Sequence, residues 1–138
     1  MSDMTAQRAA LDDARRFRAG HLMAVLEGLL EPLDVIDAAH EPTGTALRKI
    51  RLKDLILAPE KTPVRTWPLI RSRMLATLEL EVPDRSLTIG WVIDPRAGGR
   101  RLYALKDALQ PRSDVAWPGF PWAARPVVHG RGVAGPNL

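Results

Sequence analysis

The chain contains no cysteine, few aromatic residues and no long apolar run in its 138 residues. The absence of cysteine excludes disulfide scaffolds, thiolate zinc sites and cysteine nucleophiles, and it fits a reducing compartment. No segment approaches the roughly 18–20 apolar residues of a membrane span, and the N-terminus lacks the apolar core of a secretory signal. We therefore expect a cytoplasmic protein with no membrane partner.

Catalytic signals are also scarce. His21, His40 and His129 share no metal-ligand spacing, and the sequence has no HExxH, Walker A or GxSxG motif. Its acidic residues do not form a recognisable pair for general acid–base chemistry. We expect no metal, no cofactor, no catalytic residue and no enzymatic activity.

The few aromatic residues require a mostly aliphatic core, and this favours helices over a sandwich of sheets. The length is enough for one domain with a real core. Apolar spacing predicts an all-α domain over residues 1–110, beginning with a long helix from about Thr5 to Leu30. Its expected apolar face consists of Leu22, Val25, Leu26 and Leu29. Shorter helical segments are expected over about residues 32–40, 41–50, 51–58 and 100–109, and residues 86–93 are expected to form a short strand or a buried turn.

One further helix is expected to begin near residue 66. Thr66 is a plausible N-cap, with Trp67 and Pro68 in the first turn, where a missing N–H is tolerated. Val82-Pro83 would end this helix. Two apolar stripes, Ile70-Met74-Leu78 and Leu69-Ala76-Leu80, predict that it packs on more than one side.

The composition changes after Gln110, where residues 111–138 contain five prolines and four glycines. We expect a tail without stable structure of its own. Within it, the sequence "WPGFPW" sets Trp117, Phe120 and Trp122 between prolines, a pattern typical of aromatic recognition segments. This segment would bind a protein partner or fold back onto its own domain.

The basic residues concentrate in the second part of the chain. Lysine and arginine total 20 against 16 acidic residues, but residues 1–58 hold eight basic and nine acidic residues, whereas residues 59–138 hold twelve and seven. Two windows in this part have several cations and no acid. They contain Lys61, Arg65, Arg71 and Arg73 in one case and Arg96, Arg100, Arg101 and Lys106 in the other.

Both windows place cations where a loop leads into a helix, which is the positive end of the helix dipole. A bound phosphate would turn this unfavourable arrangement into a favourable one. The alternative is that the arginines pair with acidic side chains on the folded surface. The candidates for such pairing are Glu79, Glu81, Asp84 and Asp94.

The order of these elements resembles a known family. The stretch "RLKDLILAPEKTPVRTWPLIRSRMLATLELEVPDRSL", followed by "IGW" and "GGRRLYALKDAL", is similar to the actinobacterial integration host factor family, and the resemblance extends from about Ala9 to Leu109. These small nucleoid proteins contain a helix-two-turn-helix motif, which here would centre on about Lys61 to Ile70. Trp67 and Pro68 replace the glycine and lysine usual in the family's loop, and the tail has no counterpart.

The resemblance implies an architectural, nucleoid-associated protein that binds double-stranded DNA through its phosphates, largely independently of sequence. It implies roles for Arg65, Arg85, Arg100 and Arg101. Alternatives are a protein-interaction module that uses the tail and an RNA-binding protein, because the motif also occurs in ribosomal proteins. The complete set of predicted nucleic-acid-binding residues is Lys61, Arg65, Thr66, Trp67, Arg71, Arg73, Arg85, Arg96, Arg100 and Arg101.

Overall fold

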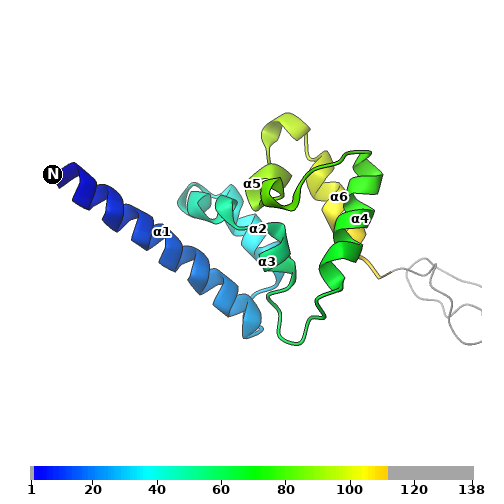
Figure 1. Ribbon diagram of the computed structural model, residues 1–138, viewed down its shortest axis with the longest axis horizontal. Helices are drawn as coiled ribbons and strands as arrows, with labels where there is room; N and C mark the ends of the chain where they lie inside the picture. The colour runs from blue at the N-terminus through cyan, green and yellow to red at the C-terminus, as the bar shows by residue number, and fades with distance from the viewer. Residues whose placement is uncertain (1, 112–138) are drawn as a thin grey trace, which may run out of the picture.

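The computed structural model describes residues 2–111 (Figure 1). The predicted tail, with Trp117, Phe120 and Trp122, lies outside this range. Residues 2–111 contain helices and no strand, which confirms the all-α prediction. The α-helices are α1 (Ser2–Leu26), α2 (Pro32–His40), α3 (Leu52–Ile56), α4 (Thr66–Leu78), α5 (Ile89–Val92) and α6 (Arg100–Leu109), and the 3₁₀ helices are η1 (Pro42–Lys49), η2 (Asp84–Ser86) and η3 (Pro95–Ala97).

Helix α1 extends away from the other elements, as Figure 1 shows. Residues 3–13 are all exposed, and Val25, near its C-terminal end, enters the core at 1 % exposure. The helix ends at Leu26 because Gly28 adopts a left-handed conformation at φ 79°. Leu26 and Leu29 are 41 % and 74 % exposed, so their predicted places on the buried face were wrong.

Helix α2 begins at Pro32, as its sequence predicts. Glu31 and Asp34 form a reciprocal capping box, in which the Glu31 N–H donates to Asp34 Oδ2 at 2.8 Å. Val35, Ile36 and Ala39 are buried on its inner face. The following η1 helix packs close to α2, and a Cβ atom on Gly44 would lie 1.9 Å from the Ala38 carbonyl oxygen.

The segment expected to be a strand or a buried turn forms the short helix α5. Thr88 caps it by accepting a hydrogen bond from the Trp91 N–H at 3.2 Å. Just before it, the backbone at Thr88 forms an isolated antiparallel bridge with Arg51. Two hydrogen bonds of 2.9 Å, from Leu52 N–H to the Leu87 carbonyl and from Ile89 N–H to the Ile50 carbonyl, fix this contact.

Helices α4 and α6 lie side by side (Figure 1) and run antiparallel. Thr77 and Leu78 at the end of α4 line a common pocket with Arg100 and Arg101 at the start of α6. Farther along, Arg73 Nη1 lies 3.5 Å from the Ala108 carbonyl oxygen. The face that α4 turns inward carries the buried residues Trp67, Ile70, Met74 and Leu75.

The second apolar stripe predicted for α4 is not buried. Leu69 and Leu80 are 50 % and 43 % exposed, and Ala76 is also exposed. The prediction that α4 packs on more than one side was therefore wrong, because no other described element covers this face. Its outer surface is consequently open to a ligand or partner.

Helix α4 also ends earlier than expected, at Leu78 instead of Val82. Glu79 adopts the left-handed conformation at φ 55°, and its N–H donates to the Ala76 carbonyl at 3.2 Å. The Leu80 N–H donates to the Leu75 carbonyl at 3.1 Å. These two bonds form a Schellman motif, which terminates the helix before the Val82-Pro83 signal is reached.

Candidate nucleic-acid interface

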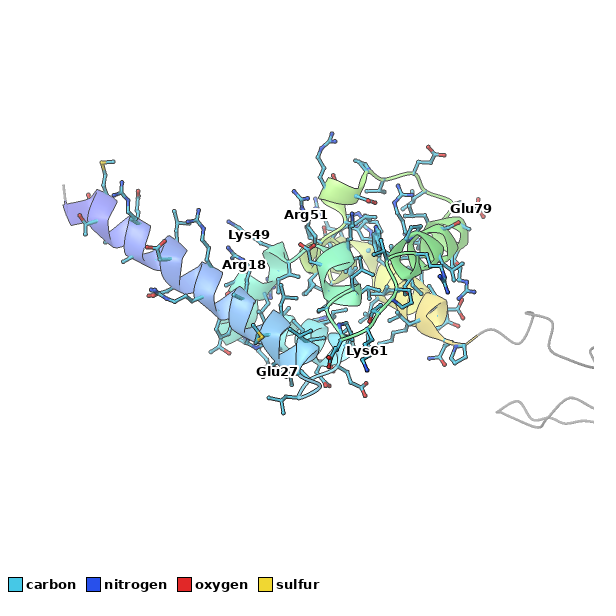
Figure 2. All side chains as sticks on the ribbon, turned by 60° about the horizontal axis from the view of Figure 1, so that its bottom comes forward. Arg18, Glu27, Lys49, Arg51, Lys61 and Glu79 are labelled. Atoms are coloured by element: carbon cyan, nitrogen blue, oxygen red, sulfur yellow. The ribbon has the colours of Figure 1, made fainter. Side chains whose placement is uncertain are left out.

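Residues 57–65 connect α3 to α4 through two successive turns. The Thr62 N–H donates to the Pro59 carbonyl at 3.2 Å, and the Thr66 N–H donates to the Pro63 carbonyl at 3.0 Å. Lys61 occupies the left-handed region at φ 68°. Figure 2 shows it on the loop that leads to α4. Two hydrogen-bonded turns therefore hold an exposed lysine in a backbone conformation that glycine normally occupies.

The N-terminus of α4 differs from the sequence prediction. Arg65 is the N-cap residue, and Thr66 is the first helical residue, because the second turn already closes at Pro63. The N–H groups of Thr66 and Trp67 donate to the carbonyls of Pro63 and Val64. Pro68, in the third helical position, has no N–H. The first three helical positions therefore offer no unpaired amide to a phosphate, so binding at this junction would depend on the Lys61 and Arg65 side chains.

Trp67 is a core residue. Only 2 % of it is exposed, and its Nε1–H donates to Asp84 Oδ2 at 3.3 Å. The prediction that this indole contacts nucleic acid is therefore corrected: the ring fills the core between α4 and η2, and its polar edge is directed to a carboxylate.

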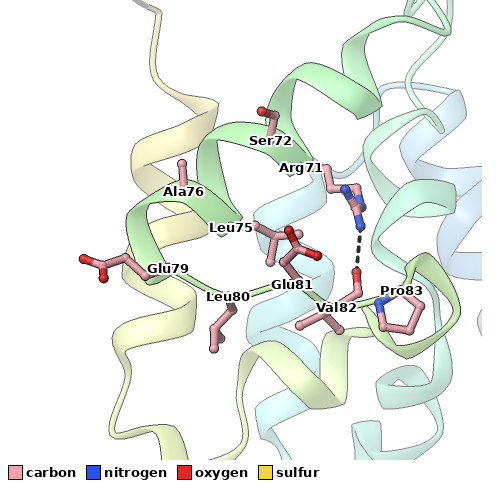
Figure 3. Close-up of a pocket in the computed structure, with 9 residues that line it drawn as sticks. All are labelled: Arg71, Ser72, Leu75, Ala76, Glu79, Leu80, Glu81, Val82 and Pro83. Carbon is pink, nitrogen blue, oxygen red and sulfur yellow. Dashed lines mark hydrogen bonds between the residues drawn. The ribbon is translucent and has the colours of Figure 1, made fainter.

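Arg71 is bound by the same acidic residue. Its Nε lies 2.6 Å from Asp84 Oδ1 in an ion pair that lacks hydrogen-bond alignment. Its Nη2 donates to the Val82 carbonyl at 2.7 Å, the bond drawn in Figure 3. For this arginine, the alternative of pairing with a surface acid is confirmed. Arg71 joins α4 to the segment that follows it, and its guanidinium is already engaged.

Arg96 is paired locally. Its Nη2 lies 2.7 Å from Asp94 Oδ2, and its backbone N–H donates to Asp94 Oδ1 at 2.9 Å. The side-chain hydrogen bond from Arg96, followed by the backbone bond, lowers the pKa of Asp94 from 3.8 to about 2. The carboxylate therefore stays ionised. Its negative charge partly offsets the positive charge that Arg96 could offer a ligand.

The other predicted arginines near α6 also contact the protein. Arg101 donates from Nη1 to the Trp91 carbonyl at 2.9 Å and stacks on the Trp91 ring at 4.4 Å from its centroid. Arg100 Nε donates to the Ala97 carbonyl at 3.4 Å, although Arg100 remains exposed. Arg73 makes its long contact with the end of α6. These residues connect α4, α5 and α6, with Arg100 the most accessible of the three.

Three predicted cations make no ion pair or side-chain hydrogen bond within residues 2–111: Lys61, Arg65 and Arg85. All three are exposed. Arg85 follows Asp84, whose carboxylate is already occupied by Arg71 and Trp67. The charge of Arg85 is thus left for solvent or a ligand.

The structure adds a basic segment that the sequence analysis did not select. Lys49, Arg51 and Lys53 are exposed, without side-chain partners in the described part of the chain. The bridge between Arg51 and Thr88 brings this segment close to the one that carries Arg85. Figure 2 shows Lys49 and Arg51 on the same side of the domain as Arg18. The signal was present in "RKIRLK", which has four cations in six residues, residues 48–53.

Comparisons with models of protein families, with curated proteins and with solved structures found no match to this chain. Across residues 2–111, no group of three or more histidine or acidic side chains is arranged to hold a metal ion. Over the same residues, none of the helices combines the length and the apolar character needed to cross a membrane.

Proposed function

We propose that this protein binds double-stranded DNA through backbone phosphates, largely independently of sequence and without catalysis. The observation that carries the proposal is the set of exposed, unpaired cations on the two-turn segment, on the η1–α3 segment and on η2. Its members are Lys61, Arg65, Arg85, Lys49, Arg51 and Lys53. We further propose that α3, the two turns and α4 form the helix-two-turn-helix motif suggested by the resemblance to integration host factors, and that the protein acts at the nucleoid.

The conformation of Lys61 supports this proposal. A residue with a Cβ atom in the left-handed region costs roughly 1–2 kcal/mol, and glycine would avoid that strain. The side chain also makes no hydrogen bond or ion pair within residues 2–111 that would compensate for it. Strain of this kind occurs often at functional sites, so the lysine is a candidate for a binding role.

The proposed mechanism divides the arginines into two groups. Arg71 and Arg101 hold the helices together through their contacts with Asp84 and Trp91. The unpaired cations bind phosphates and release condensed counterions, which makes affinity depend steeply on salt. Such contacts position the protein on a duplex but identify no base. This arrangement fits an architectural protein better than a sequence-specific regulator.

The test is fluorescence anisotropy on a short labelled duplex between about 50 and 200 mM salt. A triple variant, Lys61→Gln, Arg65→Gln and Arg85→Gln, should weaken binding and reduce the slope of log K against log salt by about 2.7, since each phosphate contact contributes about 0.9. The matched control removes three exposed charges elsewhere through Arg15→Gln, Arg16→Gln and Lys106→Gln. This control variant should reduce the slope of log K against log salt by less than the roughly 0.9 expected for one phosphate contact.

The proposal is wrong if the wild-type protein does not bind the duplex, if its binding has no salt slope, or if both triple variants lose affinity equally. Competition by duplex RNA of the same sequence tests the RNA alternative. The two helices differ in groove shape and in the 2′-hydroxyl groups. Stronger competition by RNA than by unlabelled DNA would favour RNA binding.

A further inference from the structure

The outer face of α4 presents an unpartnered apolar stripe. Leu69 and Ala76 lie seven residues apart, a spacing that puts them on one side of the helix, and Leu80 follows just after the helix ends at Leu78. All three are exposed. No described element covers them.

The stripe opens into a groove of about 740 Å³ between the C-terminal half of α4 and residues 79–83. Figure 3 shows Leu75 and Ala76 on α4 and Leu80, Val82 and Pro83 on the segment that follows it. The groove is therefore mixed in character: Arg71, Ser72, Glu79 and Glu81 line it together with these aliphatic side chains, and a proline lies at its edge. Its aliphatic part suits an apolar or aromatic group, and its polar part suits an occupant that also makes polar contacts.

Two acidic residues border this groove. Glu79 and Glu81 are both exposed and make no ion pair within residues 2–111. Their charge disfavours a phosphate, so the groove is chemically distinct from the proposed DNA-binding surface. It favours an occupant that combines apolar side chains with flanking cations.

A segment of the chain with this chemistry begins nearby. Because α6 runs antiparallel to α4 and Ala108 lies beside Arg73, the described chain ends at Pro111 toward the N-terminal end of α4, whereas the groove lies at its C-terminal half (Figure 1). The six residues from Pro111 to Trp117 can span roughly 20 Å when extended, which equals the approximate length of the 13-residue α4. An extended linker therefore brings the start of the aromatic segment to the C-terminal half of α4, where the groove lies.

The sequence of this segment complements the groove. Trp117, Phe120 and Trp122 supply the aromatic side chains, with prolines limiting the freedom that binding would remove. Arg112, Asp114 and Arg125 flank them with a net charge of +1, opposite in sign to Glu79 and Glu81. We propose that residues Trp117–Trp122 of the same chain bind in the groove on the outer face of α4. This inference does not depend on DNA binding.

The absence of native cysteine allows a direct test by disulfide trapping in the full chain. One variant carries Ala76→Cys in the groove and Ala123→Cys next to the aromatic segment. The control carries Lys106→Cys with Ala123→Cys. Lys106 is exposed on α6 and closer along the chain to the tail, so an unbound tail would reach it at least as readily. Circular dichroism checks that both variants are folded.

The groove pair should form an intramolecular disulfide at least tenfold faster than the control pair under mild oxidation. Adding Leu80→Ser to the groove pair should reduce its rate to that of the control, because it removes an exposed apolar contact without opening the core. Equal rates for the two pairs would overturn the proposal. A disulfide between two chains at low protein concentration would also overturn it, because the occupant would then be a second copy.

Discussion

Replacing Lys61 by glycine separates the stability of the two-turn segment from its proposed role in binding. Lys61 is the third residue of the first turn, which extends from Pro59 to Thr62. Its φ of 68° lies in the left-handed region. Its side chain is exposed and makes no hydrogen bond or ion pair in residues 2–111 that the substitution would remove. Lys61→Gly therefore changes two quantities, the backbone strain of the turn and one positive charge.

Two effects of the backbone change act on stability in opposite directions. Relief of the left-handed strain stabilises the fold by roughly 1–2 kcal/mol, whereas the greater freedom of glycine in the unfolded chain offsets roughly 0.5–1 kcal/mol of it. The net increase in the free energy of unfolding is about 0.5–1 kcal/mol, or about 2–8 °C in Tm for a domain of this size. At the same time, the salt slope of DNA binding should fall by about 0.9.

Glu79→Gly is the matched control. Glu79 has a similar φ of 55°, but it lies at the end of α4, is acidic and is outside the proposed interface. Thermal unfolding should show a similar gain for both variants, and anisotropy should show a reduced slope for Lys61→Gly alone. A destabilised Lys61→Gly would contradict the strain argument, and an unchanged salt slope would exclude Lys61 from the binding surface.

Four further substitutions test the packing and one ion pair. Gly44→Ala should destabilise the fold by about 1–3 kcal/mol or more in urea unfolding, because its Cβ atom would overlap a carbonyl oxygen of α2, whereas Gly20→Ala in the open part of α1 should stabilise it by roughly 0.5–1 kcal/mol. Trp67→Ala should reduce the free energy of unfolding by about 3–5 kcal/mol in the same assay. Asp94 has a lowered pKa, so its interaction with Arg96 stabilises the folded state above about pH 3.8 and is lost as the pH falls toward 2. The Tm difference between wild type and Asp94→Asn should therefore shrink over that interval.

The elements that the sequence predicted best are those with local signals. Helix α2 begins at Pro32 because proline suits the first helical position and Asp34 completes the capping box. Helix α3 lies within the predicted segment 51–58, and its residues Leu52, Leu55 and Ile56 are buried at helical spacing. In these cases residues within one or two turns determine the structure, so tertiary contacts did not alter the outcome.

The end of α4 and its exposed face could not be predicted in this way. Glu79 takes the left-handed position that glycine usually marks, so composition gave no sign that the helix stops at Leu78. Leu69 and Leu80 have apolar spacing but no described partner. An apolar stripe identifies a face that can be buried, whereas its burial depends on which elements the rest of the chain brings to it.

The candidate site was predicted only in outline for a related reason. Arg65 and Arg85 were selected from the sequence and are exposed, but Arg71 is held by Asp84, thirteen residues away along the chain. The sequence shows which acidic residues could pair with the arginines, but it does not show which arginine pairs with which acidic residue. It also gave no indication that Arg51 lies next to the Thr88 segment, because a single bridge between distant segments creates that proximity.

The structure changes the physical argument that first selected the two basic windows. A phosphate at a helix start would pair with the cations there and accept hydrogen bonds from unpaired backbone amides. At α4 the first two amides are bound by turn carbonyls and the third position is proline, while at α6 the Arg101 guanidinium is held by a carbonyl and an aromatic ring. An anion at the α4 junction would therefore depend mainly on side chains, whereas at α6 the Arg101 side chain is already engaged. Binding should follow the number of unpaired cations on the surface, and this is the quantity that the salt slope measures.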